Sequence, residues 1–129
     1  MRDNFPMHVE RYGSGSQVYF GLHGWSGDHA TFAPLAAYLP AGVALYSADL
    51  PGYGRSPAPR RWELAEITDE ITRAIAAIDS RVAVIGNCSG AVFALLAAES
   101  LKGRVERLIL IDPFAYLPLY FKIFLHRRI

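Results

Sequence analysis

The chain has 129 residues, of which 52% are hydrophobic and 19% are charged, and this composition excludes an intrinsically disordered protein. The 13 Lys and Arg residues nearly balance the 12 Asp and Glu residues, so the net charge of +1 gives no indication of nucleic-acid binding. The length allows one domain, and the single cysteine excludes an internal disulfide and a cysteine zinc cluster. Without an apolar signal region or a membrane-spanning run, we expect a soluble, cytoplasmic protein.

The first half of the chain alternates between short apolar runs and helical spacing. Val18–His23 predicts a buried strand, and a helix follows in which Phe32 and Leu35 share one face. Pro40 ends that helix, and Val43–Ala48 predicts the second strand.

The second half repeats this alternation. A loop rich in Gly and Pro covers Leu50–Pro59, and Leu64–Ile78 carries the apolar face of a long helix. Val82–Ile85 predicts a third strand. The helix Ala91–Lys102 is apolar nearly all round, so we expect it to be buried, and Val105–Ile111 predicts a fourth strand.

The order of these elements predicts the fold class. Strands and helices that alternate through short connections form an α/β fold, with a mostly parallel sheet and helices on both faces. The unbroken apolar runs agree with this, because parallel strands are covered on both faces. A further strand near Met7–Tyr12 is a weaker candidate at the front of the chain.

The turn after the third strand carries the most informative motif, Gly86-Asn87-Cys88-Ser89-Gly90. The motif has the pattern Gly-X-nucleophile-X-Gly, in which X is any residue. In this pattern a sharp turn between a strand and a helix projects the central side chain outward and holds that residue in a strained conformation. We call this turn, Gly86–Gly90, the elbow. Its two glycines, Gly86 and Gly90, give room where helix and strand pass closely. A lone cysteine is more often a small buried apolar residue. The two flanking glycines favour Cys88 as a nucleophile instead.

The loop His23-Gly24-Trp25-Ser26-Gly27-Asp28 follows the first strand. Its glycines let backbone N–H groups point above the sheet, so the N–H of Trp25 and the N–H of Ser89 are candidate oxyanion donors. His23 is interpreted as a structural histidine. Asp49 begins a third loop, where its side chain is expected to bond nearby backbone.

Four motifs taken together, HGWSGDHATF, DLPGYGRS, GNCSG and LILIDP, resemble the front half of an α/β-hydrolase-fold protein over Val18–Pro113. The resemblance implies a nucleophile at Cys88 and an oxyanion hole at the backbone of Trp25 and Ser89. It also implies that Asp49–Ser56 is a structural loop beside the pocket.

Two features depart from that family's pattern. Most members carry serine at the elbow, and the cysteine here is similar to that of dienelactone hydrolases, polyhydroxyalkanoate synthases and some thioesterase-like domains. The family order is nucleophile, acid, histidine. After Cys88 the only histidine is His126, so we expect the chain to be truncated before the acid and histidine strands. Asp112 is a candidate acid, as in a minority of lipase-like members, and a structural Asp-Pro is the alternative.

The expected organisation is therefore an N-terminal part of an α/β-hydrolase core over residues 1–115 and the start of a cap or lid over residues 116–129. The segment Leu117–Ile129 is aromatic, apolar and basic, which suits a first cap helix. Binding to a membrane surface is the alternative for this segment and is not favoured.

The predicted function is hydrolysis of an ester, thioester or lactone, with no metal and no organic cofactor. The expected partner is a small acyl substrate of apolar character, and neither nucleic acid nor a membrane is expected. The alternative is a catalytically incomplete fragment or binding protein that needs a partner chain. These two hypotheses differ in whether the protein turns over an ester.

Overall fold

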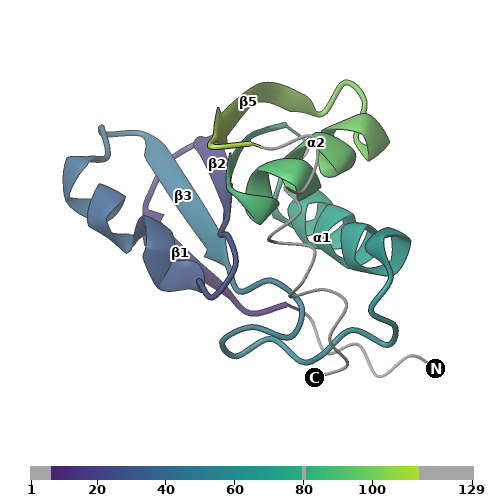
Figure 1. Cartoon of the computed structure of the whole chain (residues 1–129). Coiled ribbons are helices and arrows are strands. Elements are labelled where there is room, and N and C mark those ends of the chain that lie inside the picture. Colours follow the sequence, from purple (N-terminus) through teal and green to yellow (C-terminus); the bar gives the residue numbers. More distant parts are fainter. Residues whose placement is uncertain (1–6, 80, 114–129) are drawn as a thin grey trace.

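A computed structural model describes residues 7–79 and 81–113 of the chain. The elements, in chain order, are β1 (Val9–Gly13), β2 (Gln17–Leu22), η1 (His29–Tyr38), β3 (Val43–Ala48), α1 (Leu64–Ile78), β4 (Val82–Asn87), α2 (Ser89–Ser100) and β5 (Val105–Ile111) (Figure 1). The predicted cap segment, residues 116–129, lies outside the described residues together with His126. Within the described ranges no helix combines the length and apolar character needed to cross a bilayer.

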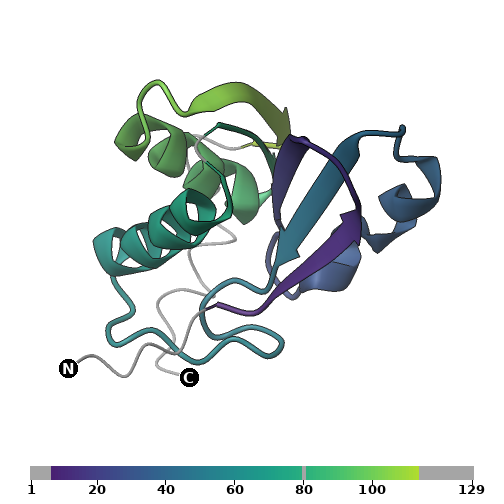
Figure 2. The ribbon, with the colours of Figure 1, turned by 180° about the vertical axis from the view of Figure 1, so that it is seen from behind.

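The described strands form one sheet in the order β1-β3-β2-β4-β5. Four strands, β3, β2, β4 and β5, run parallel to one another. The edge strand β1 runs antiparallel along β3 (Figure 2). The prediction of a mostly parallel sheet is therefore confirmed. The weaker candidate strand at the front is also present, as β1.

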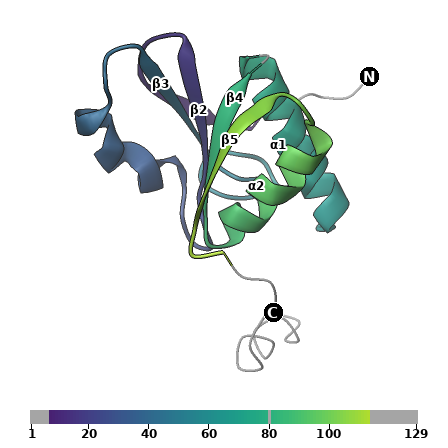
Figure 3. The same ribbon diagram turned by 90° about the horizontal axis from the view of Figure 1, so that it is seen from above.

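The sheet is covered on both faces, as predicted. Seen along the sheet, α1 and α2 lie on one side and η1 lies on the other (Figure 3). Successive strand residues point to opposite faces. Val84 accordingly belongs to the larger core under α1 and α2, whereas Ile85 packs with Phe32 of η1. Gly21 makes room for this second core, because a Cβ there would lie 2.7 Å from the Phe32 ring.

Two helices differ from the prediction. The first is a 3₁₀ helix with Pro34 inside it, a residue that lacks an N–H to donate. Of its side chains only Phe32 is buried, so Leu35 does not share the buried face as predicted.

The expectation that the helix after the elbow is buried all round is wrong for the part of the chain that the structure describes. In α2 the small residues Ala91, Ala94 and Ala97 face the sheet and are fully buried, whereas Leu95 is 45% exposed. The helix packs closely through its alanines, and no described element covers the opposite side.

Candidate functional site at the β4–α2 turn

Cys88 occupies the sharp turn that the sequence predicted. It lies between Asn87, the last residue of β4, and Ser89, the first residue of α2, with φ 56° and ψ −119°. A non-glycine residue in such a conformation costs on the order of 1–3 kcal/mol and is kept only where its surroundings hold it. Here the Cys88 N–H donates to the carbonyl of Ile111 at 2.9 Å, and the Cys88 carbonyl accepts from the Ala91 N–H at 3.0 Å.

The two flanking glycines are required by close backbone packing. A Cβ at Gly86 would lie 2.6 Å from the Cα of Ala91 in α2. A Cβ at Gly90 would overlap the carbonyl groups of Leu22 and His23, where the chain leaves β2. The elbow therefore packs closely against α2 and the end of β2, and this packing leaves no space for side chains at its two glycine positions.

The loop after β2 packs directly on the elbow. A Cβ at Gly24 would lie 2.9 Å from the Cβ of Cys88 and 3.0 Å from the carbonyl oxygen of Asn87. Trp25 follows Gly24, and Ser89 follows Cys88, so the backbones of both predicted oxyanion donors belong to segments that meet at this contact. The N–H of Ser89 is in the first turn of α2, where backbone donors have no partner within the helix.

His23 is fully buried and serves the structure, in agreement with its interpretation from sequence. Its Nδ1–H donates to the carbonyl of Gly24 at 2.7 Å, and its Nε2 accepts from the N–H of Leu50 at 2.9 Å. Burial lowers the pKa of His23, because the charged imidazolium would lose its hydration. A neutral ring with both nitrogens in use fixes the loop after β2 and is not available as a base.

Asp49 is also fully buried, at the end of β3. Its Oδ1 accepts from the backbone N–H and the Nδ1–H of His29, at 2.6 and 2.9 Å, and its Oδ2 accepts from the N–H of Arg55 at 2.9 Å. Burial alone would raise the pKa of this carboxyl group, but the hydrogen bonds from Arg55 and His29 outweigh it, so the pKa of Asp49 is lowered. Asp49 bonds local backbone, as expected. Its bond to the His29 side chain was not foreseen, because no sequence spacing brings residues 29 and 49 together.

Asp112 directly follows Ile111, the residue of β5 whose carbonyl accepts the Cys88 N–H. Its backbone therefore lies beside the elbow, with φ 49° and an exposed side chain. The described histidines have other contacts: His23 with Gly24 and Leu50, His29 with Asp49, and His8 with Glu10. The structure brings Asp112 to the elbow, but no described histidine contacts it.

One pocket among the described residues lies elsewhere. A pocket of about 250 Å³ opens under η1 and includes Gln17 and Val43, the first residues of β2 and β3. It is therefore near the amino ends of these strands, whereas Cys88 follows the carboxyl end of β4. Among described residues, two groups could hold a metal ion, Asp28–His29–Asp49 and His8–Glu10–His29, and neither includes Cys88.

The comparison with known families agrees with this architecture. Residues 21–128 match the model of the alpha/beta hydrolase family, and the chain belongs to that family. Lipase LipV of Mycobacterium tuberculosis is 33% identical over 113 residues, which are 83% of this chain and 41% of that protein. A pimeloyl-(acyl-carrier protein) methyl ester esterase of Neisseria meningitidis is 34% identical over 101 residues, which are 78% of this chain and 38% of that protein.

Solved structures give the same picture. An alpha/beta hydrolase from Sphaerobacter thermophilus is 28% identical with a TM-score of 0.75, over 87% of this chain and 43% of that one. An esterase from a marine microorganism has a TM-score of 0.81 at 19% identity, covering 94% of this chain and 48% of that one, and shows likeness of fold alone. The chain thus spans about two fifths of the length of the two curated relatives named above.

Proposed function

We propose that this chain supplies the nucleophile and the oxyanion hole of an enzyme that transfers the acyl group of an ester, thioester or lactone to water. The observation that carries the proposal is the conformation of Cys88, held at φ 56° between β4 and the first turn of α2. Strain of this kind is kept where it presents a reactive side chain. Membership of the alpha/beta hydrolase family supports the reaction class.

In the proposed mechanism, the Cys88 thiolate attacks the carbonyl carbon of the substrate. A C–S bond forms, and the carbonyl π electrons move to the oxygen, giving a tetrahedral oxyanion. The backbone N–H groups of Trp25 and Ser89 would stabilise that charge, each by about 3 kcal/mol in the transition state. Collapse expels the alcohol or thiol, which takes the proton that a base removed from Cys88, and leaves an acyl group on Cys88. Attack by water then releases the acid and restores the thiol.

The proposed mechanism also needs a base to remove the thiol proton and to activate water. His23 cannot serve, because both of its ring nitrogens are engaged. We therefore assign the base to a histidine outside the described residues, with Asp112 as the candidate acid that orients it. A lone thiol stays reduced in a reducing compartment, which supports our proposal of a cytoplasmic location.

The proposed substrate has an apolar acyl group. Trp25 follows Gly24, which lies against Cys88, and the residue is 61% exposed, so its aromatic ring is a candidate surface for an apolar group. The two curated relatives are named as a lipase and as a methyl ester esterase, which makes a carboxylic ester the first substrate class to test.

The test uses the natural full-length protein with a short-chain p-nitrophenyl ester. Cys88→Ala is expected to lower kcat by at least about a thousandfold, because loss of a nucleophile removes the covalent route. Ser100→Ala, at the opposite end of α2, should leave kcat within twofold. Intact-mass analysis should also detect an acyl adduct on the wild-type protein and none on Cys88→Ala. Unchanged turnover in Cys88→Ala would refute the proposed role of Cys88.

The second candidate function is a catalytically incomplete protein that binds acyl compounds or a partner chain. It is favoured by one observation: the rings of His8, His23 and His29, the histidines in the described ranges, hydrogen-bond other groups and not Cys88. In that case iodoacetamide would still alkylate Cys88, but the wild-type protein would not turn over ester, alone or as purified from its source.

A further inference from the structure

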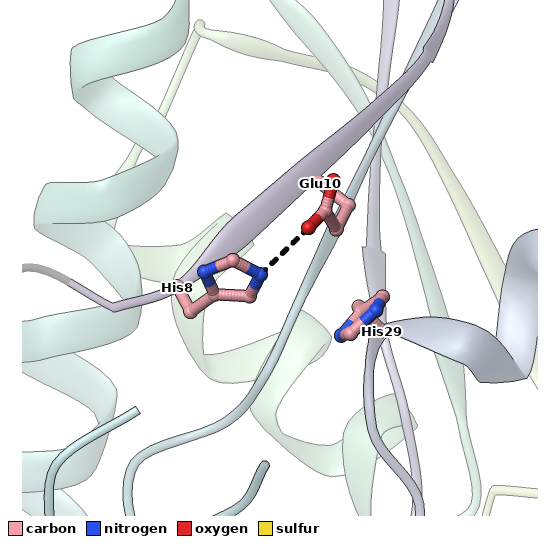
Figure 4. A group of neighbouring side chains, drawn as sticks. All are labelled: His8, Glu10 and His29. Carbon is pink, nitrogen blue, oxygen red and sulfur yellow. Dashed lines mark hydrogen bonds and ion pairs between the residues drawn. The ribbon is translucent and has the colours of Figure 1, made fainter. Parts of the chain in front are cut away.

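A cluster of three metal-ligating side chains lies between β1 and the start of η1, apart from the elbow. His8 directly precedes β1, Glu10 is the second residue of β1, and His29 is the first residue of η1 (Figure 4). The Nε2 of His8 lies 2.9 Å from the Oε1 of Glu10, and the rings of His8 and His29 are 5.3 Å apart at their centroids. One donor atom from each residue lies within 4.8 Å of the other two.

The backbone of His8 is fixed on both sides. Its N–H donates to the Oγ of Ser56 at 2.8 Å, and its carbonyl accepts from the N–H of Asp49 at 2.8 Å. Glu10 follows two positions later, and residues two apart on an extended chain point to the same side. The side chains of His8 and Glu10 are therefore held next to each other by the strand itself.

The position of His29 is fixed even more closely. Its backbone N–H and its ring Nδ1–H both donate to the buried carboxylate of Asp49, and its carbonyl accepts from the Oγ of Ser47 at 2.7 Å. A carboxylate accepts only, so Nδ1 carries the proton and Nε2 keeps its lone pair. A carboxylate behind the distal nitrogen is the usual support of a histidine that binds a metal through its other nitrogen.

We propose that His8, Glu10 and His29 form a binding site for a divalent transition-metal ion, with zinc as the preferred ion and water completing its coordination. Two imidazoles and one carboxylate are a ligand set that suits zinc. Zinc–nitrogen bonds of about 2.0–2.1 Å need donor atoms about 3.4 Å apart, so small rotations bring these three onto one ion. The His8 and His29 side chains are 25% and 24% exposed, which leaves the site open to solvent.

The neighbouring group of Asp28, His29 and Asp49 is a poorer candidate. Both oxygens of Asp49 already accept N–H groups, and its side chain is fully buried. Asp28 caps η1 through a 2.8 Å bond from the Ala30 N–H. An ion there would have to displace bonds that hold the fold, whereas at His8 and Glu10 it replaces one hydrogen bond between exposed groups.

An ion in the proposed site would link the edge strand β1 to His29, the first residue of η1. Its role is structural, and the proposal is independent of the chemistry at Cys88. No metal is expected from the sequence, because the single cysteine gives no zinc cluster and the family resemblance implies no cofactor. His8 and His29 are far apart along the chain. The pairing of β1 with β3 places His8 next to Asp49, which in turn holds His29.

The experiment titrates zinc chloride into the chelator-treated natural full-length protein by calorimetry, with magnesium chloride as a second probe. We expect one zinc ion per chain at this site and no comparable binding of magnesium, which prefers oxygen ligands. His8→Phe and Glu10→Gln should each weaken zinc binding by at least about tenfold. The matched control is Glu99→Gln, which changes an exposed acid on α2 that pairs with Lys102. It should change the zinc affinity by less than twofold.

Thermal unfolding gives a second readout. Zinc should raise the Tm of the wild-type protein and of Glu99→Gln, but not that of Glu10→Gln, because a ligand stabilises only the state that binds it. Glu10 is partly exposed, so Glu10→Gln tests the site even if His8→Phe does not fold. The proposal is overturned if the wild-type protein does not bind zinc saturably, or if Glu10→Gln binds it as tightly as the wild type.

Discussion

His23 and Asp49 are polar side chains that are completely buried beside the candidate site. Leaving such a group without a partner costs about 1–3 kcal/mol, and more if it is charged. Both avoid this cost: His23 uses its two ring nitrogens, and Asp49 accepts three N–H bonds through its two oxygens. Together they tie the loop after β2, the start of η1 and the loop after β3 into one unit behind the elbow.

The lowered pKa of His23 predicts a pH dependence of stability. Because the folded state keeps this ring neutral, the unfolded state binds more protons once the pH falls below about 6.5. The contribution of His23 is therefore complete above about pH 6.5 and is lost as the pH falls toward the lowered pKa of the folded state. We expect the free energy of unfolding, measured by urea denaturation, to decline over this range.

The contribution of His23 is isolated by comparison with a variant that lacks its ring. His23→Asn should be less stable than the wild type at pH 7.5, and its stability should fall less steeply between pH 6.5 and pH 5. Parallel stability curves for the two proteins would contradict the assignment of a neutral, buried His23.

At the scale of elements, α2 is the structural support of the elbow. Its first turn begins at Ser89, immediately after Cys88, and its alanines let it lie close against β4 and β5. A helix that packs through small side chains brings its N-terminus close to the ends of the strands. The Cys88 N–H in turn donates to the carbonyl of Ile111, which continues the pairing of β4 with β5 by one residue.

Substitutions at two adjacent positions of α2 should therefore differ in their cost to stability. Ala94 is fully buried, so Ala94→Leu forces extra volume between helix and sheet and should cost about 1–3 kcal/mol in free energy of unfolding. Leu95 is exposed, and Leu95→Lys should stay within about 0.5 kcal/mol of the wild type. Equal effects of the two variants in urea denaturation would show that α2 packs differently.

At the scale of the whole molecule, the described sheet ends at β1 and at β5. Edge strands carry backbone groups that can pair with another chain. Large apolar side chains are also exposed on the described surface, among them Leu35 and Tyr38 of η1 and Ile111 of β5. Both features favour association with another chain.

The chain prepared as residues 1–129 alone is accordingly expected to self-associate as its concentration rises. Sedimentation velocity should show a growing fraction of larger species, and the double variant Leu35→Lys with Ile111→Lys should reduce that fraction. Leu64→Lys replaces another exposed leucine, at the start of α1, and serves as the control. A wild-type chain that stays monomeric at high concentration would contradict this prediction.

The sequence by itself determined the alternation of strands and helices, the parallel sheet and the position of the elbow. These features depend on local signals: apolar periodicity and the spacing of Gly86 and Gly90 around Cys88. Each of them involves residues within a few positions of one another, so one stretch of chain is enough to predict it.

Only the tertiary structure decided which face of α2 is buried, that η1 is a 3₁₀ helix, and that His29 bonds Asp49. It also decided that His8, Glu10 and His29 meet. All of these depend on which segments the sheet order places side by side. Strand order results from the packing of the whole domain, and no local pattern of residues specifies it.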